Sequence, residues 1–126
     1  MCIRDSHHET GDIWFTDPTY GYAQAFRPYP TLPAQVYRFR PSTHECWVVA
    51  DGFEMCNGLC FSPDYKRLYV TDTGASQAHN GPGDGHQFSL DPRKPSTIYV
   101  YDVVDGCYLH NRRTFAYCDS LSLIHI

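Results

Sequence analysis

Short apolar runs alternate with turn residues along the whole chain. The first run, residues 13–16, stops at Asp17 and Pro18, and the run over residues 36–40 stops at Pro41. The other runs are residues 46–50, 59–61, 68–71, 98–101 and 108–117. Short runs rich in β-branched and aromatic residues, bounded by turn residues, are typical of β-strands. Because no segment has apolar residues at helical spacing over three turns, the pattern predicts an all-β protein.

Two of these runs repeat along the chain. Residues 11–17 (GDIWFTD) align with residues 66–72 (KRLYVTD) at a shift of 55, and residues 36–39 (VYRF) align with residues 98–101 (IYVY) at a shift of 62. A polar loop from about residue 75 to residue 96 absorbs the difference. Such strand repeats are typical of β-propeller blades. The repeat predicts one complete blade over residues 57–117. It predicts three strands of the preceding blade, which lacks its fourth, over residues 11–53.

The two ends of the chain differ from the rest. The hexapeptides MCIRDS (1–6) and LSLIHI (121–126) can be encoded by DNA strings that are reverse complements, offset by a base at their ends. The string also resembles a transposon end used to build sequencing libraries. We therefore interpret residues 1–6 and 121–126 as translated adapter and exclude them from fold reasoning. The expected native part is a partial propeller domain over residues 7–120, with His7 and His8 at an exposed strand end.

Composition narrows the classes of partner. The chain has a formal net charge of −4, and it has no basic run of the kind that binds nucleic acid or anionic lipid. No apolar stretch approaches the 18 residues or so of a membrane span, so we expect no membrane insertion. No signal peptide is recognisable, but with residues 1–6 interpreted as adapter this leaves the localisation open.

The cysteines do not form a metal-binding pattern. Cys56 and Cys60 are four residues apart, and no second pair or matching His pair accompanies them. A zinc site needs further ligands at regular spacing. We therefore predict that the cysteines outside the ends are buried free thiols, which pack like small apolar side chains.

Several segments resemble one known family. Residues 11–21 (GDIWFTDPTYG), 57–64 (NGLCFSPD), 68–74 (LYVTDTG) and 111–116 (NRRTFA) are similar to motifs of gluconolactonases and regucalcin-like proteins, in the same order. The resemblance implies a six-bladed β-propeller, of which this chain holds about two blades. It also implies one divalent cation in the central channel, with Ca²⁺ as the first expectation and Zn²⁺, Mn²⁺ or Mg²⁺ as alternatives.

Asn57 is the one cation ligand that the resemblance places in this chain. In the family an acid near the N-terminus, two asparagines and a later aspartate hold the ion, and the other three ligands fall outside residues 7–120. The family usually has Pro before this Asn, where this chain has Cys56. An amide oxygen suits a hard cation such as Ca²⁺. The alternative is that Asn57-Gly58 is simply a turn that enters a strand.

Three other residues are candidates for weaker roles. Asp17 and Asp72 take the same place in the two repeats, so we expect both to be structural and to cap a turn, or to support the ligands from behind. Tyr20 lies in a loop that, in the family, borders the substrate pocket, and it is predicted to bind substrate; an aromatic cover over the blade is the alternative. The loop over residues 79–86 has metal-capable side chains without the spacing of a calcium loop, and is expected to be a flexible surface loop.

The resemblance implies a metal-dependent lactone hydrolase that acts on a small-molecule lactone. Water would attack a lactone carbonyl polarised by the cation, and the general base is expected outside this chain. The alternative is a non-catalytic calcium-binding or interaction propeller, because a fold does not determine a function.

Overall fold

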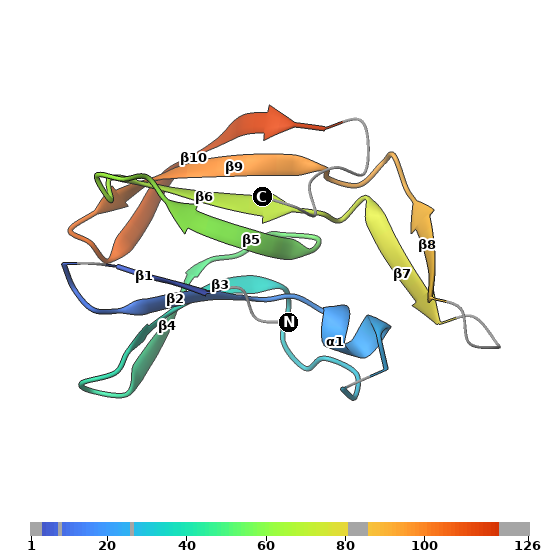
Figure 1. Cartoon of the computed structure of the whole chain (residues 1–126), viewed down its shortest axis with the longest axis horizontal. Helices are drawn as coiled ribbons and strands as arrows, with labels where there is room; N and C mark the ends of the chain where they lie inside the picture. Colours follow the sequence, from blue (N-terminus) through green and yellow to red (C-terminus); the bar gives the residue numbers. More distant parts are fainter. Residues whose placement is uncertain (1–3, 8, 26, 81–85, 119–126) are drawn as a thin grey trace.

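The computed structural model describes residues 4–7, 9–25, 27–80 and 86–118, and antiparallel strands make up most of it. The elements are β1 (Arg4–Ser6), β2 (Ile13–Asp17), α1 (Tyr20–Ala23), β3 (Gln35–Arg40), β4 (Glu45–Ala50), β5 (Cys56–Phe61), β6 (Arg67–Asp72), β7 (Ser76–Asn80), β8 (His86–Leu90), β9 (Thr97–Val104) and β10 (Tyr108–Tyr117). The first sheet has the order β1-β2-β3-β4 and the second sheet the order β5-β6-β9-β10, while β7 and β8 form a separate hairpin (Figure 1). The predicted all-β class is confirmed. Within the described residues no helix is long and apolar enough to cross a membrane.

The first sheet has four strands, whereas the sequence predicts three. The added strand is β1, which pairs antiparallel with β2 so that Asp5 lies opposite Trp14. Residues 1–6 are excluded from the prediction because of their coding pattern, yet three of them complete the hydrogen bonding at the edge of β2. Strand pairing uses main-chain groups that every residue carries, so it does not require a recognisable strand pattern.

The internal repeat holds at the level of strand register. Residues that pair across β2 and β3 in the first sheet align, in the repeat, with residues that pair across β6 and β9 in the second sheet. The partners are Ile13–Phe39, Phe15–Tyr37 and Thr16–Val36 in the first sheet, and Leu68–Tyr101, Val70–Tyr99 and Thr71–Ile98 in the second. Because register decides which face each side chain takes, the two sheets are structural copies of one unit.

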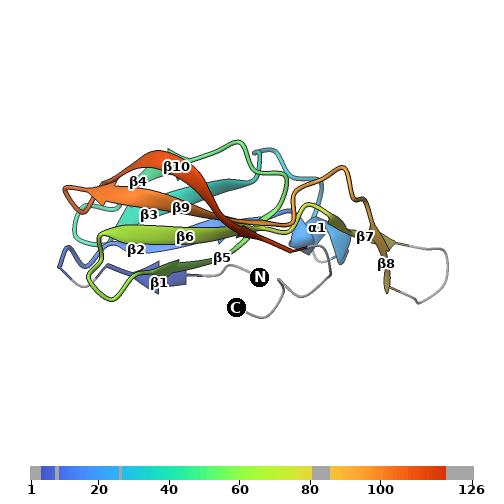
Figure 2. The same ribbon diagram turned by 90° about the horizontal axis from the view of Figure 1, so that it is seen from above.

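Equivalent strands nevertheless bury opposite faces. Trp14 of β2 is fully buried and aligns with the partly exposed Tyr69, whereas Val70 of β6 is fully buried and aligns with the partly exposed Phe15. One face of the first sheet therefore packs on the opposite face of the second. Figure 2 shows the two sheets overlapping when seen from above. The core between them consists of Trp14, Ala34, Val36, Phe53, Cys56, Leu59, Leu68, Val70 and Tyr101. Within the part of the chain that the structure describes, this head-to-tail contact leaves one face of each sheet uncovered, and these are called the outer faces below.

The outer faces are aromatic. On the first sheet Phe15 stacks on Tyr37 with ring centroids 5.3 Å apart, and on the second sheet Phe115 meets Tyr69 edge-on at 5.0 Å. Phe115 is 60% exposed and Val48 of β4 is 50% exposed. Aromatic surface of this extent on both sides of a two-sheet unit is typical of a surface that another protein element covers.

The segment predicted as a polar loop, residues 75–96, contains a hairpin, and most of the predicted flexible loop over residues 79–86 lies outside the described residues. β7 and β8 pair from Ser76–Leu90 to Asn80–His86, and residues 81–85 lie outside the described residues. Polar residues dominate this segment, so it has no alternating apolar pattern from which strands could be predicted. The hairpin and α1 both project from the same end of the molecule (Figure 1).

Two predictions about burial are wrong. His7 is 2% exposed, with its ring 5.2 Å from that of Phe61 and 5.0 Å from that of Tyr65, because the chain after β1 turns in between the sheets; His8 lies outside the described residues. Among the predicted buried thiols, Cys56 is buried, but Cys46 and Cys60 are exposed because each points to an outer face.

Candidate functional site

Asn57 lies in a β-bulge near the start of β5. The pairing of β5 with β6 shifts register there, so that Asn57 and Gly58 together lie opposite the single residue Thr71. Bulges interrupt the hydrogen-bond ladder and redirect side chains, and they are common beside functional sites. The Asn-Gly step is therefore a bulge inside a strand and not a turn that precedes one.

Two threonine hydroxyls hold the peptide group between Asn57 and Gly58. Thr16 Oγ1, from the first sheet, donates to the Asn57 carbonyl oxygen at 2.7 Å. The Gly58 N–H donates to Thr71 Oγ1, also at 2.7 Å. Gly58 allows this approach, because a Cβ at that position would lie 3.3 Å from the Thr71 hydroxyl oxygen. Both main-chain groups of the bulged peptide are thus satisfied by side chains.

The side chain of Asn57 is partly exposed. Its side-chain amide makes no hydrogen bond to the residues that the structure describes. The hydrogen bond from Thr16 goes to the main-chain carbonyl of Asn57 and not to this amide. The described residues also contain no group of three or more His, Cys, Asp or Glu side chains placed to hold a metal. An amide oxygen fits a hard cation, so this part of the chain supplies one suitable donor and not a complete ligand set.

Asp72 fixes the segment that leads into the bulge. Its carboxylate is fully buried and accepts three main-chain N–H groups, from Glu54 at 3.0 Å, Met55 at 2.9 Å and Gly74 at 3.1 Å. Charged acceptors that bind main-chain N–H groups form the stronger class of hydrogen bond. The contacts of Asp72 are those of a structural residue behind Asn57.

Asp17 has no such environment, although it occupies the same repeat position. It faces outward and pairs with Arg27 at 3.9 Å, with 38% of its side chain exposed. Among the described residues, no main-chain N–H donates to the Asp17 carboxylate as those of Glu54 and Met55 donate to Asp72. An exposed ion pair of this kind contributes little to stability.

Asp72→Asn is expected to lower the free energy of unfolding of the complete gene product that contains this sequence by about 1–3 kcal/mol. An amide has one acceptor oxygen where the carboxylate has two, so the amide NH2 group would face at least one of the three N–H groups and leave it without a hydrogen bond. Asp17→Asn is the matched control and should change stability by no more than about 0.5 kcal/mol. Urea unfolding of both variants is the measurement, and equal effects from the two substitutions contradict the distinction drawn between these residues.

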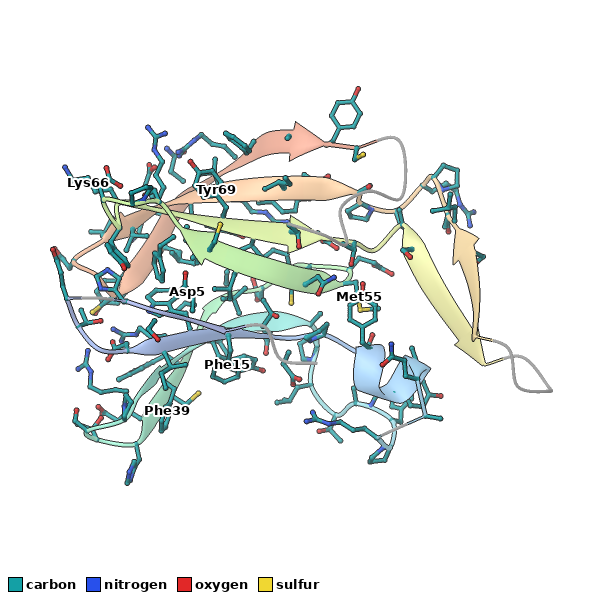
Figure 3. The ribbon with its side chains drawn as sticks, viewed as in Figure 1. Asp5, Phe15, Phe39, Met55, Lys66 and Tyr69 are labelled. Carbon is teal, nitrogen blue, oxygen red and sulfur yellow. The ribbon has the colours of Figure 1, made fainter. Side chains whose placement is uncertain are left out.

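Tyr20 links α1 to the second sheet. Its hydroxyl lies 2.5 Å from Thr73 Oγ1, and the neighbouring Thr19 hydroxyl contacts Met55 Sδ at 3.2 Å. Burial raises the pKa of Tyr20, and the Asp72 charge adds to the rise against the opposite effect of the Thr73 hydrogen bond. The hydroxyl is thus a neutral hydrogen-bond partner of Thr73. Figure 3 shows Met55 beside α1 at this end of the sheets.

Cys56, which precedes Asn57, is a core residue. Its thiol donates to the Gln35 carbonyl oxygen at 3.4 Å, and burial together with the nearby Asp72 charge raises its pKa to about 12. The thiol is therefore occupied by a core hydrogen bond to the main chain of Gln35, at the start of β3.

Arg112 holds the segment that connects the two sheets. Its guanidinium lies 3.8 Å from the centroid of the Tyr99 ring and 4.8 Å from that of Phe53. It also donates to the carbonyl oxygens of Asp51 at 3.2 Å and Gly52 at 3.4 Å. Arg112 therefore connects β10 to Asp51 and Gly52, in the segment between β4 and β5 that precedes the Asn57 bulge.

A cleft of about 240 Å³ lies elsewhere, between α1 and the loop that follows it. It is lined by Asp17, Pro18, Thr19, Gly21, Tyr22, Arg27, Pro28, Tyr29, Pro30, Thr31 and Leu32. Neither Asn57 nor Tyr20 lines this cleft, so it is separate from the bulge.

These features define a class of protein. Four-stranded antiparallel sheets of one repeated unit stack head to tail, and α1 and the β7–β8 hairpin project from one end (Figure 1). This is the arrangement of a propeller-like, almost all-β protein.

Comparison with known proteins identifies the family. The family model described as SMP-30/Gluconolactonase/LRE-like region matches residues 6–96. The lactonohydrolase oryL of Aspergillus oryzae is 45% identical over 103 residues, covering 79% of this chain and 23% of that protein. Serum paraoxonase/arylesterase 2 of Homo sapiens is 35% identical over 72 residues, covering 57% of this chain and 19% of that protein. This chain belongs to the SMP-30/gluconolactonase/LRE-like family.

A solved structure supports the same assignment. A gluconolactonase from Xanthomonas campestris superimposes with a TM-score of 0.66 at 32% sequence identity, over 92% of this chain and 33% of that chain. The chain therefore spans a third or less of the length of the proteins that it matches.

Three threonines near Asn57 are absent from the sequence-based predictions. Thr16, Thr71 and Thr73 bind the main chain or side chains around the bulge. A signal for two of them exists in the sequence, because both repeats end in Thr-Asp. The repeated Thr-Asp step predicts that Thr16 and Thr71 occupy equivalent positions in the two sheets. It does not predict what their hydroxyls bind, because that depends on the bulge at Asn57 and Gly58.

Proposed function

We propose that the complete gene product containing this chain is a metal-dependent lactone hydrolase, with the Asn57 amide oxygen as one ligand of a divalent cation, Ca²⁺ in the first place. The observation that carries the proposal is the Asn57 bulge. Its main chain is held from both sheets, while its amide is not used by the described residues. Membership of a lactonase-type family supports the reaction class.

We also propose that the two sheets are two blades of a six-bladed propeller. Two sheets match 33% of the chain of the Xanthomonas campestris gluconolactonase, which fits about six sheets in the whole. The head-to-tail contact supports this arrangement, because a contact between unlike faces closes into a ring when the rotation between units allows it.

The residues of this chain would have separate tasks in the reaction. A bound cation polarises the lactone carbonyl and stabilises the negative charge that develops on its oxygen. Asn57 holds that cation, and Asp72 keeps the preceding segment in place. Asp72 is committed to three N–H groups, so we place the general base outside this chain. Tyr20 is proposed to contact the substrate through its ring.

The test is turnover by the complete gene product, read from the genomic locus through both ends of this sequence. We expect hydrolysis of gluconolactone or a related sugar-acid lactone, its loss on chelation, and its recovery with Ca²⁺. Zn²⁺, Mn²⁺ and Mg²⁺ are compared in the same assay. An aryl ester is the second substrate, because one relative is named an arylesterase. Cation binding without turnover of any lactone or ester would identify the non-catalytic calcium-binding or interaction propeller instead.

A further inference from the structure

The bulge creates a main-chain problem that the sheet cannot solve. Two residues, Asn57 and Gly58, lie opposite one, so the peptide between them has no regular partner in the β5–β6 ladder. Main-chain groups without partners destabilise a folded protein when they are shielded from water. The direction in which Asn57 points depends on how this one peptide group is held.

The two hydroxyls that hold it come from equivalent places. Thr16 and Thr71 align in the repeat, and each is nearly or fully buried, at 0% and 4% exposure. One binds the carbonyl side of the peptide and the other binds the N–H side, each at 2.7 Å. Thr16 lies on the face of the first sheet that contacts the second sheet, whereas Thr71 belongs to the second sheet itself. The two threonines therefore bind the same peptide group from different sheets, although they share one position in the repeat.

We propose that Thr16 and Thr71 are positioning residues that set the orientation of the Asn57–Gly58 peptide and thereby aim the Asn57 amide at the cation. The inference rests on the proposed cation site. It adds that this site is assembled across the contact between two sheets, because Thr16 belongs to the first sheet and Asn57 to the second. Gly58 is part of the device, since any Cβ there crowds the Thr71 hydroxyl.

The experiment removes each hydroxyl without changing side-chain shape. Thr16→Val and Thr71→Val are made in the metal-free complete gene product, and Ca²⁺ affinity is measured by calorimetry. We expect affinity to fall about 10-fold in each, the effect typical of groups that orient a ligand. Thr16→Ser and Thr71→Ser keep the hydroxyl and should restore most of the affinity. Thr→Val variants that bind Ca²⁺ like the wild type overturn the proposal.

A control separates positioning from stability. Leu68 is fully buried at the start of β6, away from the bulge, so Leu68→Val should lower stability and leave Ca²⁺ affinity unchanged. Equal weakening by this control overturns the positioning role. If a valine variant does not fold, Gly58→Ala retains both hydroxyls while displacing that of Thr71, and wild-type affinity in this variant also overturns it.

The same series distinguishes the two proposals. Asn57→Ala with unchanged Ca²⁺ affinity rejects the cation site itself, and the positioning role with it. Weakened binding in Asn57→Ala beside wild-type binding in both valine variants rejects the positioning role alone. Hydrogen exchange gives a readout independent of the cation, because the Gly58 amide should exchange faster in Thr71→Val.

Discussion

Replacing Asn57 with Ala in the complete gene product is expected to weaken Ca²⁺ binding at least about 10–100-fold, the range known for groups that only support a ligand. Loss of an ordinary neutral hydrogen bond amounts to about 1 kcal/mol, which is roughly five-fold in affinity. A larger effect is expected because the substitution removes a direct oxygen donor from a site with few protein ligands. Lactone turnover should fall in parallel and recover partly at high Ca²⁺.

Two further variants make this test specific. Asn57→Asp keeps an oxygen donor and should still bind Ca²⁺. Asn111→Ala, far along the chain in β10, removes a hydrogen bond to Asp102 and should affect stability without affecting the cation. Calorimetric titration beside lactone turnover is the measurement. Unchanged affinity in Asn57→Ala rejects the ligand assignment.

The 126-residue chain expressed alone is expected to show no cooperative melt and to associate or precipitate. Both outer faces expose apolar side chains among the described residues, with Val48 of the first sheet at 50% and Phe115 of the second at 60% exposure. Stability in repeat architectures comes from contacts between neighbouring units, and this chain has one such contact where a ring gives every sheet two. Exposed strand edges add a further route to aggregation.

Thermal unfolding and sedimentation of the isolated chain test this expectation, with the complete gene product as the cooperative control. Because the outer faces are unlike, association should proceed head to tail. Charged substitutions at Val48 and Phe115, one on each outer face, should therefore reduce association without restoring a cooperative melt. A sharp two-state transition from a monomer contradicts the assignment of these faces as contact surfaces.

Strand positions were predictable because the strands that form the core carry the hydrophobic pattern. All seven predicted runs are strands, and the repeat anticipates their cross-strand register. β1 and the β7–β8 hairpin were not predictable, since main-chain pairing holds them and no periodic apolar face marks them. Burial of His7 depends on a tertiary contact with Phe61 and Tyr65, which lie far along the sequence.

The candidate site was predictable only in part. Asn57 was found through family motifs, because a single amide has no spacing pattern of its own. The bulge around it arises from a register shift of one residue, which no local composition signals. Asp72 accepts three main-chain hydrogen bonds, whereas Asp17, at the identical repeat position in the first sheet, lacks those partners, so the repeat does not predict the surroundings of either residue.

Because equivalent strands bury opposite faces, β2 and β6 should differ from ordinary surface strands in which substitutions they tolerate. A strand with one wet face accepts polar residues at every second position. In this unit Trp14 and Thr16, on one face of β2, are buried against the second sheet, whereas Phe15 on the other face stacks on Tyr37 and is partly exposed. If that face is covered in the intact protein, a deep mutational scan of residues 13–16 and 68–71 should show sensitivity at consecutive positions. Its profile would then resemble that of a strand buried between two layers.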